Sequence, residues 1–536
     1  MLKPMYRPLS DLAVLAALTL AGCDKKEEAA KAPYAVEEVS LAQISSDLSA
    51  GKTTSAAVTQ AYIERINLYD ERLNSVIMIA PDALQQAAAS DLRRKDGKAI
   101  GPLDGIPVLL KDNIDAVGMP TTAGSFAMTE NMPAQDSEVT KRLRAAGAVI
   151  LGKANTSQWA GLRTTGAFAG STVGGTTRNP YDLTRTAAGS SNGSGIAAAA
   201  SFAAATIGTD TTGSIMGPSS LMGLVGMRPS VALISRRGIV PVSLSQDTAG
   251  PMTRSVMDYA MMLNVVAGSD PGDPWSADAD ANKTDYVKAL STESLKGKKL
   301  GVFRNTAGHT DATKPIFDAA LEVLKAQGAE LVDLPPDLLE DLGNEQRLIM
   351  YYDVKQDIGA YLTTAPSAVK VRTLADIIAF NKADPRESIH GQEHFEAAEA
   401  LTGGRENPEF QKIWEYAHRR AGPEGYGRAF TEFGVSALVA AARGPAAVQQ
   451  PDGATGGGAA LEQPKGSRPP SISGVAALAQ WPNLTVPMGD VEGLPVGLSF
   501  VGPKWSEATL LSYGYAYEQA SKARKPPAAY KEATAK

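Results

Sequence analysis

The chain has 536 residues, a formal net charge of −6 at pH 7 and a single cysteine. This length allows a large buried core, and the lone cysteine excludes a disulfide within the chain and a zinc site built on several cysteines. Lysine and arginine number 52 against 58 aspartate and glutamate residues, so the chain lacks the basic excess that phosphate binding needs, and we expect no nucleic-acid partner.

The N-terminus has the layout of a secretory signal. Lys3 and Arg7 precede an apolar stretch, Leu12–Gly22, which is shorter than a membrane span of about twenty residues. The stretch ends in Leu20-Ala-Gly-Cys23, which resembles the lipoprotein box of bacteria, in which the thiol receives diacylglycerol. We therefore expect residues 1–22 to be a lipoprotein signal peptide and Cys23 to be lipidated. A plain secretory signal with an incidental cysteine is the alternative.

The residues after Cys23 are polar and lack apolar periodicity, so we expect residues 23–35 to form a lipidated, flexible tether. The protein would then be anchored to a membrane without spanning it, on the periplasmic side of the inner or outer membrane. From residue 36 to about residue 530, helical and strand-like segments alternate without a long low-complexity break. We expect a single domain over residues 36–530.

Periodicity within this domain predicts its elements. Apolar residues recur at helical spacing in Ser55–Tyr69, with Thr53 or Thr54 as the N-cap. A second helix is predicted over Ile316–Ala326. Short apolar runs predict strands at Ile106–Leu110, Ala148–Leu151, Leu300–Phe303, Leu331–Leu334, Ala437–Ala440, Leu484–Pro487 and Val496–Val501. The alternation predicts an α/β layered fold with a mixed or mostly parallel sheet, in which Pro451–Gly474 is a surface excursion.

A belt rich in glycine, serine and threonine occupies Ala188–Gly195 and Gly208–Ile215, on either side of an alanine-rich helix. Such a belt is typical of a phosphate cradle or a nucleophile site. A phosphate loop is disfavoured because no Gly-Lys-Ser/Thr follows. Gly189–Gly193 matches Gly-x-Ser-x-Gly with Ser191 at the centre, which would make a serine esterase. That interpretation needs a histidine, and the downstream histidines are in polar surroundings: His309, His390, His394 and His418.

A serine can also be activated by a lysine that has lost its proton. Lys111 ends the apolar run from Gly101 and is followed by Asp112 and Asn113, so it is a charged residue at the tip of an apolar strand. Taken alone, such a lysine is usually a side chain that reaches out to water. Its importance therefore depends on the motifs around it.

Those motifs occur in an order that resembles the amidase-signature family. The matching segments are Gly101–Asn113, Thr177–Tyr181, Gly189–Gly195, Gly208–Ile215, Gly223–Gly226, Gln246–Met252, Leu484–Gly489 and Leu494–Phe500. Within that family the chain is most similar to peptide amidases, with Ser235–Pro241 and Thr373–Asn381 as supporting stretches. The likeness covers roughly residues 36 to 530, and the ordered series is more specific than any one motif.

The resemblance implies an α/β/α layered amidase-signature fold with a central mixed β-sheet, and a triad without a histidine. Ser214 is then the nucleophile, Ser190 the bridging serine in a cis peptide bond with Gly189, and Lys111 the base. The backbone N–H groups of Thr211, Thr212, Gly213 and Ser214 would form the oxyanion hole. The implied enzyme needs no metal and no cofactor.

Three features depart from the family pattern, and a second lysine competes with Lys111. Thr212 stands where relatives often have glycine. Met216-Gly-Pro218 replaces an arginine-containing continuation, and Ala440–Pro445 replaces the usual Pro-Thr after a strand, in a region that lines the substrate pocket. Lys153, also at a strand end, is a rival base without a matching motif. We expect Asp210 to fix the turn by accepting backbone hydrogen bonds.

The sequence therefore predicts an amidase, a hydrolase of non-peptide C–N bonds in linear amides. It would convert a small-molecule or peptide amide, such as a peptide C-terminal amide, into the acid and ammonia or an amine. The alternatives are a histidine-dependent esterase that uses Ser191, and a catalytically inactive amidase-like binding lipoprotein.

The predicted tether can be tested by replacing its acyl acceptor. Because Cys23 is the only thiol in the chain, Cys23→Ala should release the protein from membranes or block its processing. Membrane fractionation with radiolabelled palmitate measures both effects. An unchanged membrane fraction would refute lipidation.

Overall fold

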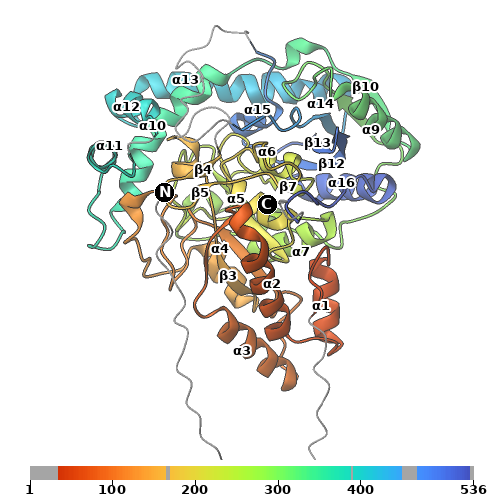
Figure 1. The fold of residues 1–536 in the computed structure, drawn as a ribbon. Coiled ribbons are helices and arrows are strands. Elements are labelled where there is room, and N and C mark those ends of the chain that lie inside the picture. Colours follow the sequence, from red (N-terminus) through yellow and green to blue (C-terminus); the bar gives the residue numbers. More distant parts are fainter. Residues whose placement is uncertain (1–33, 164–168, 388–389, 450–467, 532–536) are drawn as a thin grey trace, which may run out of the picture. The chain divides into compact units, whose positions relative to one another are not determined.

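A computed structural model of the chain describes residues 34–163, 169–387, 390–449 and 468–531. Most of them belong to one layered unit built on an eleven-stranded sheet, with helices on its two faces (Figure 1). The signal peptide, Cys23 and most of the predicted tether lie outside the described residues, as does most of the predicted excursion Pro451–Gly474.

The large sheet is mixed. Its strand order is β1-β3-β2-β6-β8-β7-β12-β13-β11-β9-β10, and β4 pairs with β5 in a separate two-stranded sheet. The pairs β2/β3, β2/β6, β9/β10 and β9/β11 are parallel, and the other pairs of the large sheet are antiparallel. The strands are β1 Val76–Ile79, β2 Pro107–Lys111, β3 Val149–Ala154, β4 Gly170–Ser171, β5 Gly175–Thr176, β6 Ala205–Asp210, β7 Val225–Arg228, β8 Thr248–Thr253, β9 Lys299–Val302, β10 Glu330–Asp333, β11 Ala437–Ala441, β12 Asn483–Val491 and β13 Leu494–Val501.

All seven apolar runs predicted to be strands lie in this sheet, as β2, β3 and β9 to β13. The runs on either side of Pro451–Gly474 join it together, since β11 pairs directly with β13. Strands β7 and β8 were not predicted, because their sequences are interrupted by glycine, proline and arginine and show neither an apolar run nor alternation. Both are nevertheless buried throughout, so the surrounding sheet and helices determine their conformation.

The helices are α1 Leu41–Ser49, α2 Ser55–Tyr69, α3 Ala83–Lys95, α4 Glu138–Ala145, α5 Asn192–Ala199, α6 Met216–Leu221, α7 Val256–Val266, α8 Ala279–Asn282, α9 Lys314–Ala326, α10 Gly343–Leu362, α11 Leu374–Ala383, α12 Glu393–Ala400, α13 Pro408–Ala421, α14 Gly427–Phe433, α15 Ile472–Ala479 and α16 Glu507–Ser521. The helix predicted over Ser55–Tyr69 is confirmed with the same bounds, and its N-cap is Thr54, whose hydroxyl accepts the N–H of Ala57. The helix predicted over Ile316–Ala326 begins two residues earlier, as α9.

Two sets of helices cover the sheet. Helices α4, α7, α16 and α9 form one row of neighbours that packs on β3, β7, β8 and β12. Helices α5 and α6 pack together on the central strands. Helices α10, α12, α13 and α14 lie with α15 in the upper part of the view in Figure 1, and α10 and α13 contact α15. A separate apolar cluster joins α10, α13 and α15 to β9, β11 and β13 through Phe303, Leu438 and Val501. The mixed sheet with flanking helices agrees with the predicted α/β/α architecture.

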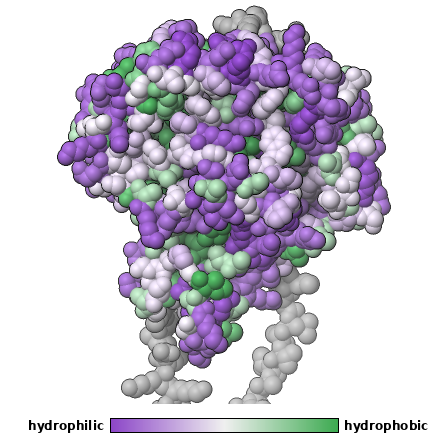
Figure 2. Space-filling view, turned by 180° about the vertical axis from the view of Figure 1, so that it is seen from behind, coloured by the Kyte–Doolittle hydropathy of each residue, from purple (hydrophilic) through white to green (hydrophobic). Residues whose placement is uncertain are grey.

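The surface is predominantly hydrophilic on the face that Figure 2 shows. Hydrophobic colour gathers in small areas in the lower part of that view, where α2 and α3 lie in Figure 1. Exposed apolar side chains on or near these helices include Leu68, Leu84 and Leu92. No helix among the described residues combines the length and the apolar character that crossing a membrane requires.

The topology brings the predicted site together. Strands β2 and β6 are adjacent and parallel, with Leu110 opposite Ile207. Their carboxyl ends therefore meet at one edge of the sheet. Lys111, the last residue of β2, lies there beside the second half of the glycine-serine-threonine belt, and α5 brings the first half to the same edge.

Candidate active site

The Lys111 side chain is completely buried at the end of β2. Its Nζ atom lies 2.7 Å from the Oγ atom of Ser190 and 2.8 Å from the Oγ1 atom of Thr209. The carbonyl oxygen of Thr209 is a third neighbour, at 3.5 Å. The amine is thus surrounded by neutral oxygen atoms, and the described chain places no carboxylate within ion-pair distance of it.

This environment favours the uncharged amine. Removal from water lowers the pKa of Lys111 to about 7, although Asp210 and Asp247 act in the opposite direction. Desolvation dominates because neither acid touches the amine. Lys111 is therefore poised to exchange a proton near neutral pH, which a lysine in water does not do.

Two hydrogen bonds hold the backbone of Ser190 in place. The Gly189–Ser190 peptide bond is cis, as the resemblance implied. The Ser190 carbonyl oxygen accepts the Ser157 N–H at 3.0 Å and the Thr156 hydroxyl at 3.1 Å. These bonds anchor the main chain and leave the Ser190 hydroxyl to face Lys111.

Two residues that sequence analysis did not single out hold the other side of the lysine. Asn113 donates from Nδ2 to the Thr209 hydroxyl at 3.1 Å and to the Val240 carbonyl at 3.3 Å. The Thr209 oxygen therefore accepts from both Asn113 and Lys111, which occupies both of its lone pairs. Thr209 and Asn113 fix the direction of the amine. Both lie within the quoted motifs, but only the fold shows that they meet.

Ser214 lies in the turn between β6 and α6. The turn contains Gly213 at a φ of 125°, a backbone conformation that side chains disfavour. Ser214 is half-buried, its carbonyl accepts the Ser191 N–H at 3.2 Å, and its hydroxyl has no partner within the described part of the chain. This hydrogen bond between Ser191 and Ser214 joins the two halves of the belt. It brings Ser214 into the same site as Ser190, the residue before Ser191.

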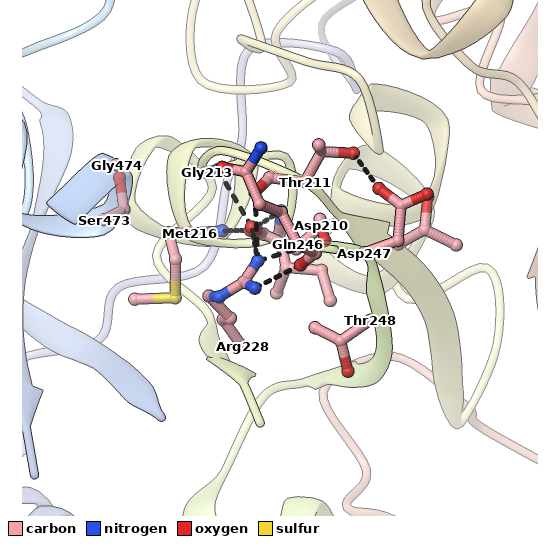
Figure 3. Close-up of polar contacts among 12 residues, drawn as sticks. Asp210, Thr211, Gly213, Met216, Arg228, Gln246, Asp247, Thr248, Ser473 and Gly474 are labelled. Atoms are coloured by element: carbon pink, nitrogen blue, oxygen red, sulfur yellow. Dashed lines mark hydrogen bonds and ion pairs between the residues drawn. The ribbon is translucent and has the colours of Figure 1, made fainter. Parts of the chain in front are cut away.

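Asp210 organises that turn, as predicted. Its carboxylate accepts the N–H groups of Gly213, Ile215 and Met216, at 2.9, 2.7 and 3.3 Å. Arg228 forms an ion pair with Asp210 at 3.0 Å, and both side chains are completely buried (Figure 3). The same guanidinium group binds the carbonyl oxygens of Asp210 and Thr211 at 3.1 Å. Arg228 offsets the charge of Asp210, which weakens the field of this acid at Lys111.

A second acid supports the turn from its other side. Asp247 accepts the Thr211 hydroxyl at 2.6 Å (Figure 3) and the N–H groups of Val242 and Ser243 at 2.8 and 2.9 Å. Burial raises the pKa of the Asp247 carboxyl, in spite of these hydrogen bonds. Its engagement with backbone and hydroxyl groups indicates a scaffold role.

The four predicted oxyanion donors differ in their environment. The Gly213 N–H already donates to Asp210. The N–H groups of Thr211, Thr212 and Ser214 have no acceptor in the described ranges, so they are available to a ligand. Thr212 is not among the residues with positive φ, so its replacement of glycine does not force the backbone into a left-handed conformation.

The rival residues have other partners. Lys153 donates to the Ile114 carbonyl at 2.5 Å and to the Thr121 hydroxyl at 3.0 Å, and it lies 3.7 Å from Asp112. In the described ranges it makes no hydrogen bond to a serine hydroxyl. The Ser191 hydroxyl donates to the Thr209 carbonyl at 3.0 Å and accepts the Thr209 N–H at 3.2 Å, inside the core. A serine engaged in this way is a poor nucleophile candidate.

Three of the four histidines contact groups other than a serine hydroxyl. The ring of His394 contacts the Tyr351 hydroxyl at 2.5 Å, and the ring of His418 contacts the Leu478 carbonyl at 2.7 Å. His309 packs edge-on against Phe317. In the described ranges, no group of three or more histidine, cysteine, aspartate or glutamate side chains is arranged to hold a metal ion.

Comparison with known proteins identifies the relatives of this chain. The family model described as Amidase matches residues 57–511. A probable amidase of Arabidopsis thaliana is 34% identical over 511 residues, which cover 92% of each chain. The crystal structure of native peptide amidase from Stenotrophomonas maltophilia superposes with a TM-score of 0.85 at 40% identity, over 92% of this chain and 98% of that one. A peptide amidase in complex with the competitive inhibitor chymostatin gives a TM-score of 0.84 at 40% identity, over 92% and 99%.

Proposed function

The chain belongs to the amidase family and is an amide hydrolase, and we propose that Ser214, Ser190 and Lys111 carry out its reaction through a serine acyl-enzyme. Ser214 is the nucleophile, Ser190 relays the proton and Lys111 is the base. One observation carries the proposal above all. A completely buried amine, with a pKa lowered to about 7, lies 2.7 Å from the hydroxyl of the serine in a cis peptide bond.

The hydrogen bonds around Lys111 define the direction of proton transfer. A neutral amine has two hydrogen atoms and one lone pair. The two oxygens of Thr209 accept the hydrogens, which leaves the lone pair facing the Ser190 hydroxyl. Lys111 then takes the proton of Ser190 while Ser190 takes the proton of Ser214, whose oxygen attacks the amide carbon.

The later steps reuse the same groups. The N–H groups of Thr211, Thr212 and Ser214 stabilise the oxyanion of the tetrahedral intermediate, and one such donor is worth about 3 kcal/mol of barrier. The proton returns along Lys111 and Ser190 to the leaving nitrogen, which departs as ammonia or an amine. Water, deprotonated by the same relay, then hydrolyses the acyl-enzyme to the acid and regenerates Ser214.

The choice of substrate rests on similarity. Both peptide amidase structures are 40% identical to this chain over more than nine tenths of its length. We therefore propose a peptide C-terminal amide as the first substrate class to test. A binding protein without catalysis would not need the buried lysine, and an esterase based on Ser191 would need a hydroxyl that Thr209 does not already engage.

The location of the enzyme is a separate proposal that depends on residues 1–35. The apolar stretch that ends in Leu20-Ala-Gly-Cys23 supports a signal peptide followed by a lipidated cysteine. Residues 23–35 would then tether the amidase domain to a bacterial membrane on its periplasmic side.

The lowered pKa of Lys111 predicts a specific pH dependence. The reaction needs the unprotonated amine, so kcat/KM should be constant above the pKa of about 7. It should fall about tenfold for each pH unit below 7, because the fraction of neutral lysine falls by that factor. Ammonia release measured between pH 5 and pH 9 tests this. A rate independent of pH across this range would contradict Lys111 as the base.

Replacement of the nucleophile gives a second test. Ser214→Ala should lower kcat by about 10³-fold or more, since a relay without its nucleophile cannot form the acyl-enzyme. Ser49→Ala, at the end of α1, is a matched control that should retain full activity. Ammonia release from a panel of peptide amides is the measurement, with thermal melts to confirm folding. Equal activity in Ser214→Ala and the wild-type protein would eliminate Ser214.

A further inference from the structure

One arginine near the two serines has no role in the proposed mechanism. Arg443 follows β11 by two residues, at the carboxyl end of that strand. Its side chain is exposed to solvent, yet surrounding protein atoms lower the pKa of its guanidinium group by desolvation. The guanidinium group is therefore crowded by protein atoms while part of the residue stays open to solvent. An arginine remains charged in such surroundings.

Contacts place this guanidinium group beside the catalytic turn. Gly217, three residues after Ser214, has so little space around it that a Cβ atom there would lie 2.8 Å from Nη1 of Arg443. The same Cβ would lie 3.5 Å from the Cβ of Ala188, two residues before Ser190. The Gly217 N–H donates to the Gly213 carbonyl at 2.8 Å, so it belongs to the turn that carries Ser214. Arg443 therefore lies next to the segments that carry both serines.

The charge of Arg443 is not compensated. No carboxylate of the described chain lies within 4 Å of it, although the protein is acidic overall. Other arginines near the belt differ in this respect, since Arg228 pairs with Asp210 and Arg236 pairs with Asp273. An unpaired guanidinium group that protein atoms partly desolvate favours an anion, and its planar fork matches a carboxylate.

The backbone around Arg443 is held firmly. The Ala442 N–H donates to the Gly497 carbonyl in β13 at 2.8 Å. Gly308 approaches so closely that a Cβ there would lie 2.1 Å from the Ala441 carbonyl oxygen and 2.8 Å from the Arg443 nitrogen. The arginine thus projects from a fixed strand end, which is how proteins preorganise a binding group.

We propose that Arg443 binds a carboxylate of the substrate and that this enzyme prefers amides that carry a carboxylate beside the scissile bond. The inference rests on the proposed amide hydrolysis and specifies its substrate class. In the family, the segment that contains Gly217 usually carries an arginine. In this chain Gly217 leaves room there for the guanidinium group of Arg443, which follows β11. The carboxylate could belong to an acidic residue of a peptide amide or to a dicarboxylic acid monoamide.

Paired substrates test the preference. Acetyl-Glu-amide is compared with the neutral acetyl-norleucine-amide, and glutaramate with pentanamide, by ammonia release. In the wild-type protein, the anionic member of at least one pair should have the higher kcat/KM, and the pair identifies the source of the carboxylate. Arg443→Gln should lower kcat/KM for that anionic amide by about 30-fold, as expected for a charge-assisted bidentate contact, and leave the neutral amide within about twofold.

Two further variants separate binding from folding. Gly217→Ala should displace the arginine and reproduce the selective loss, because its Cβ would lie 2.8 Å from the movable end of Arg443, whereas its 3.5 Å distance to the Cβ of Ala188 is an ordinary van der Waals contact. Arg428 is an exposed arginine in α14 that pairs with Glu432. Arg428→Gln removes the same charge elsewhere and should leave kcat/KM unchanged for both the anionic and the neutral amide. Equal hydrolysis of both pair members by the wild-type protein, or an equal loss for both in Arg443→Gln, overturns the inference. Failure of the wild-type protein on every amide would instead count against the proposed function.

Discussion

The burial of a lysine amine without a counter-ion is the constraint on which this site depends. Lys111 ends a completely buried strand, and among the described residues only neutral oxygens of Ser190 and Thr209 lie within hydrogen-bond distance of its Nζ atom. The folded state cannot hold an ammonium ion there without losing its hydration, so the pKa falls to about 7. The glycine-, serine- and threonine-rich belt places hydroxyl groups around this amine.

The nearby acids could have cancelled the effect, and their contacts explain why they do not. Asp210 directs its carboxylate to three backbone N–H groups of the turn and to Arg228. Asp247 is taken up by Thr211 and by backbone N–H groups, and burial raises the pKa of its carboxyl. The same contacts that shape the turn therefore keep negative charge away from Lys111. Arg228 binds Asp210 and the neighbouring carbonyl oxygens of Thr211 and Gln246, whereas Arg443 has no carboxylate within ion-pair distance in the described part of the chain.

The sequence predicted those parts of the molecule that follow from local pattern or from an ordered motif series. Apolar runs located seven strands, and the apolar spacing in Ser55–Tyr69 located a helix and narrowed its N-cap to Thr53 or Thr54, of which the structure has Thr54. The motifs placed Lys111 and Ser190 in one site, and the structure brings their side chains into contact. Asp210 fixes the turn as expected, because the N–H groups that its carboxylate accepts belong to residues only a few positions further along the chain.

The remaining features depend on contacts between distant segments. Strands β7 and β8 have no apolar signal and form because neighbouring strands and helices bury them. The ion pair between Asp210 and Arg228 crosses between strands, and the approach of Arg443 to Gly217 joins segments more than two hundred residues apart. The hydrogen bonds that engage Ser191 with Thr209 were equally invisible, since a Gly-x-Ser-x-Gly match does not show where a hydroxyl points.

The protonation state of Lys111 in the folded protein tests the central claim most directly. Protein labelled with ¹⁵N at the lysine side chains can be titrated by NMR, with Lys111→Met to assign the signal of this residue. We predict a titration midpoint near pH 7, because desolvation outweighs the attraction of Asp210 and Asp247. A midpoint close to the value of about 10.4 for a lysine in water would contradict the account, since the amine would then be protonated whenever the enzyme is at neutral pH.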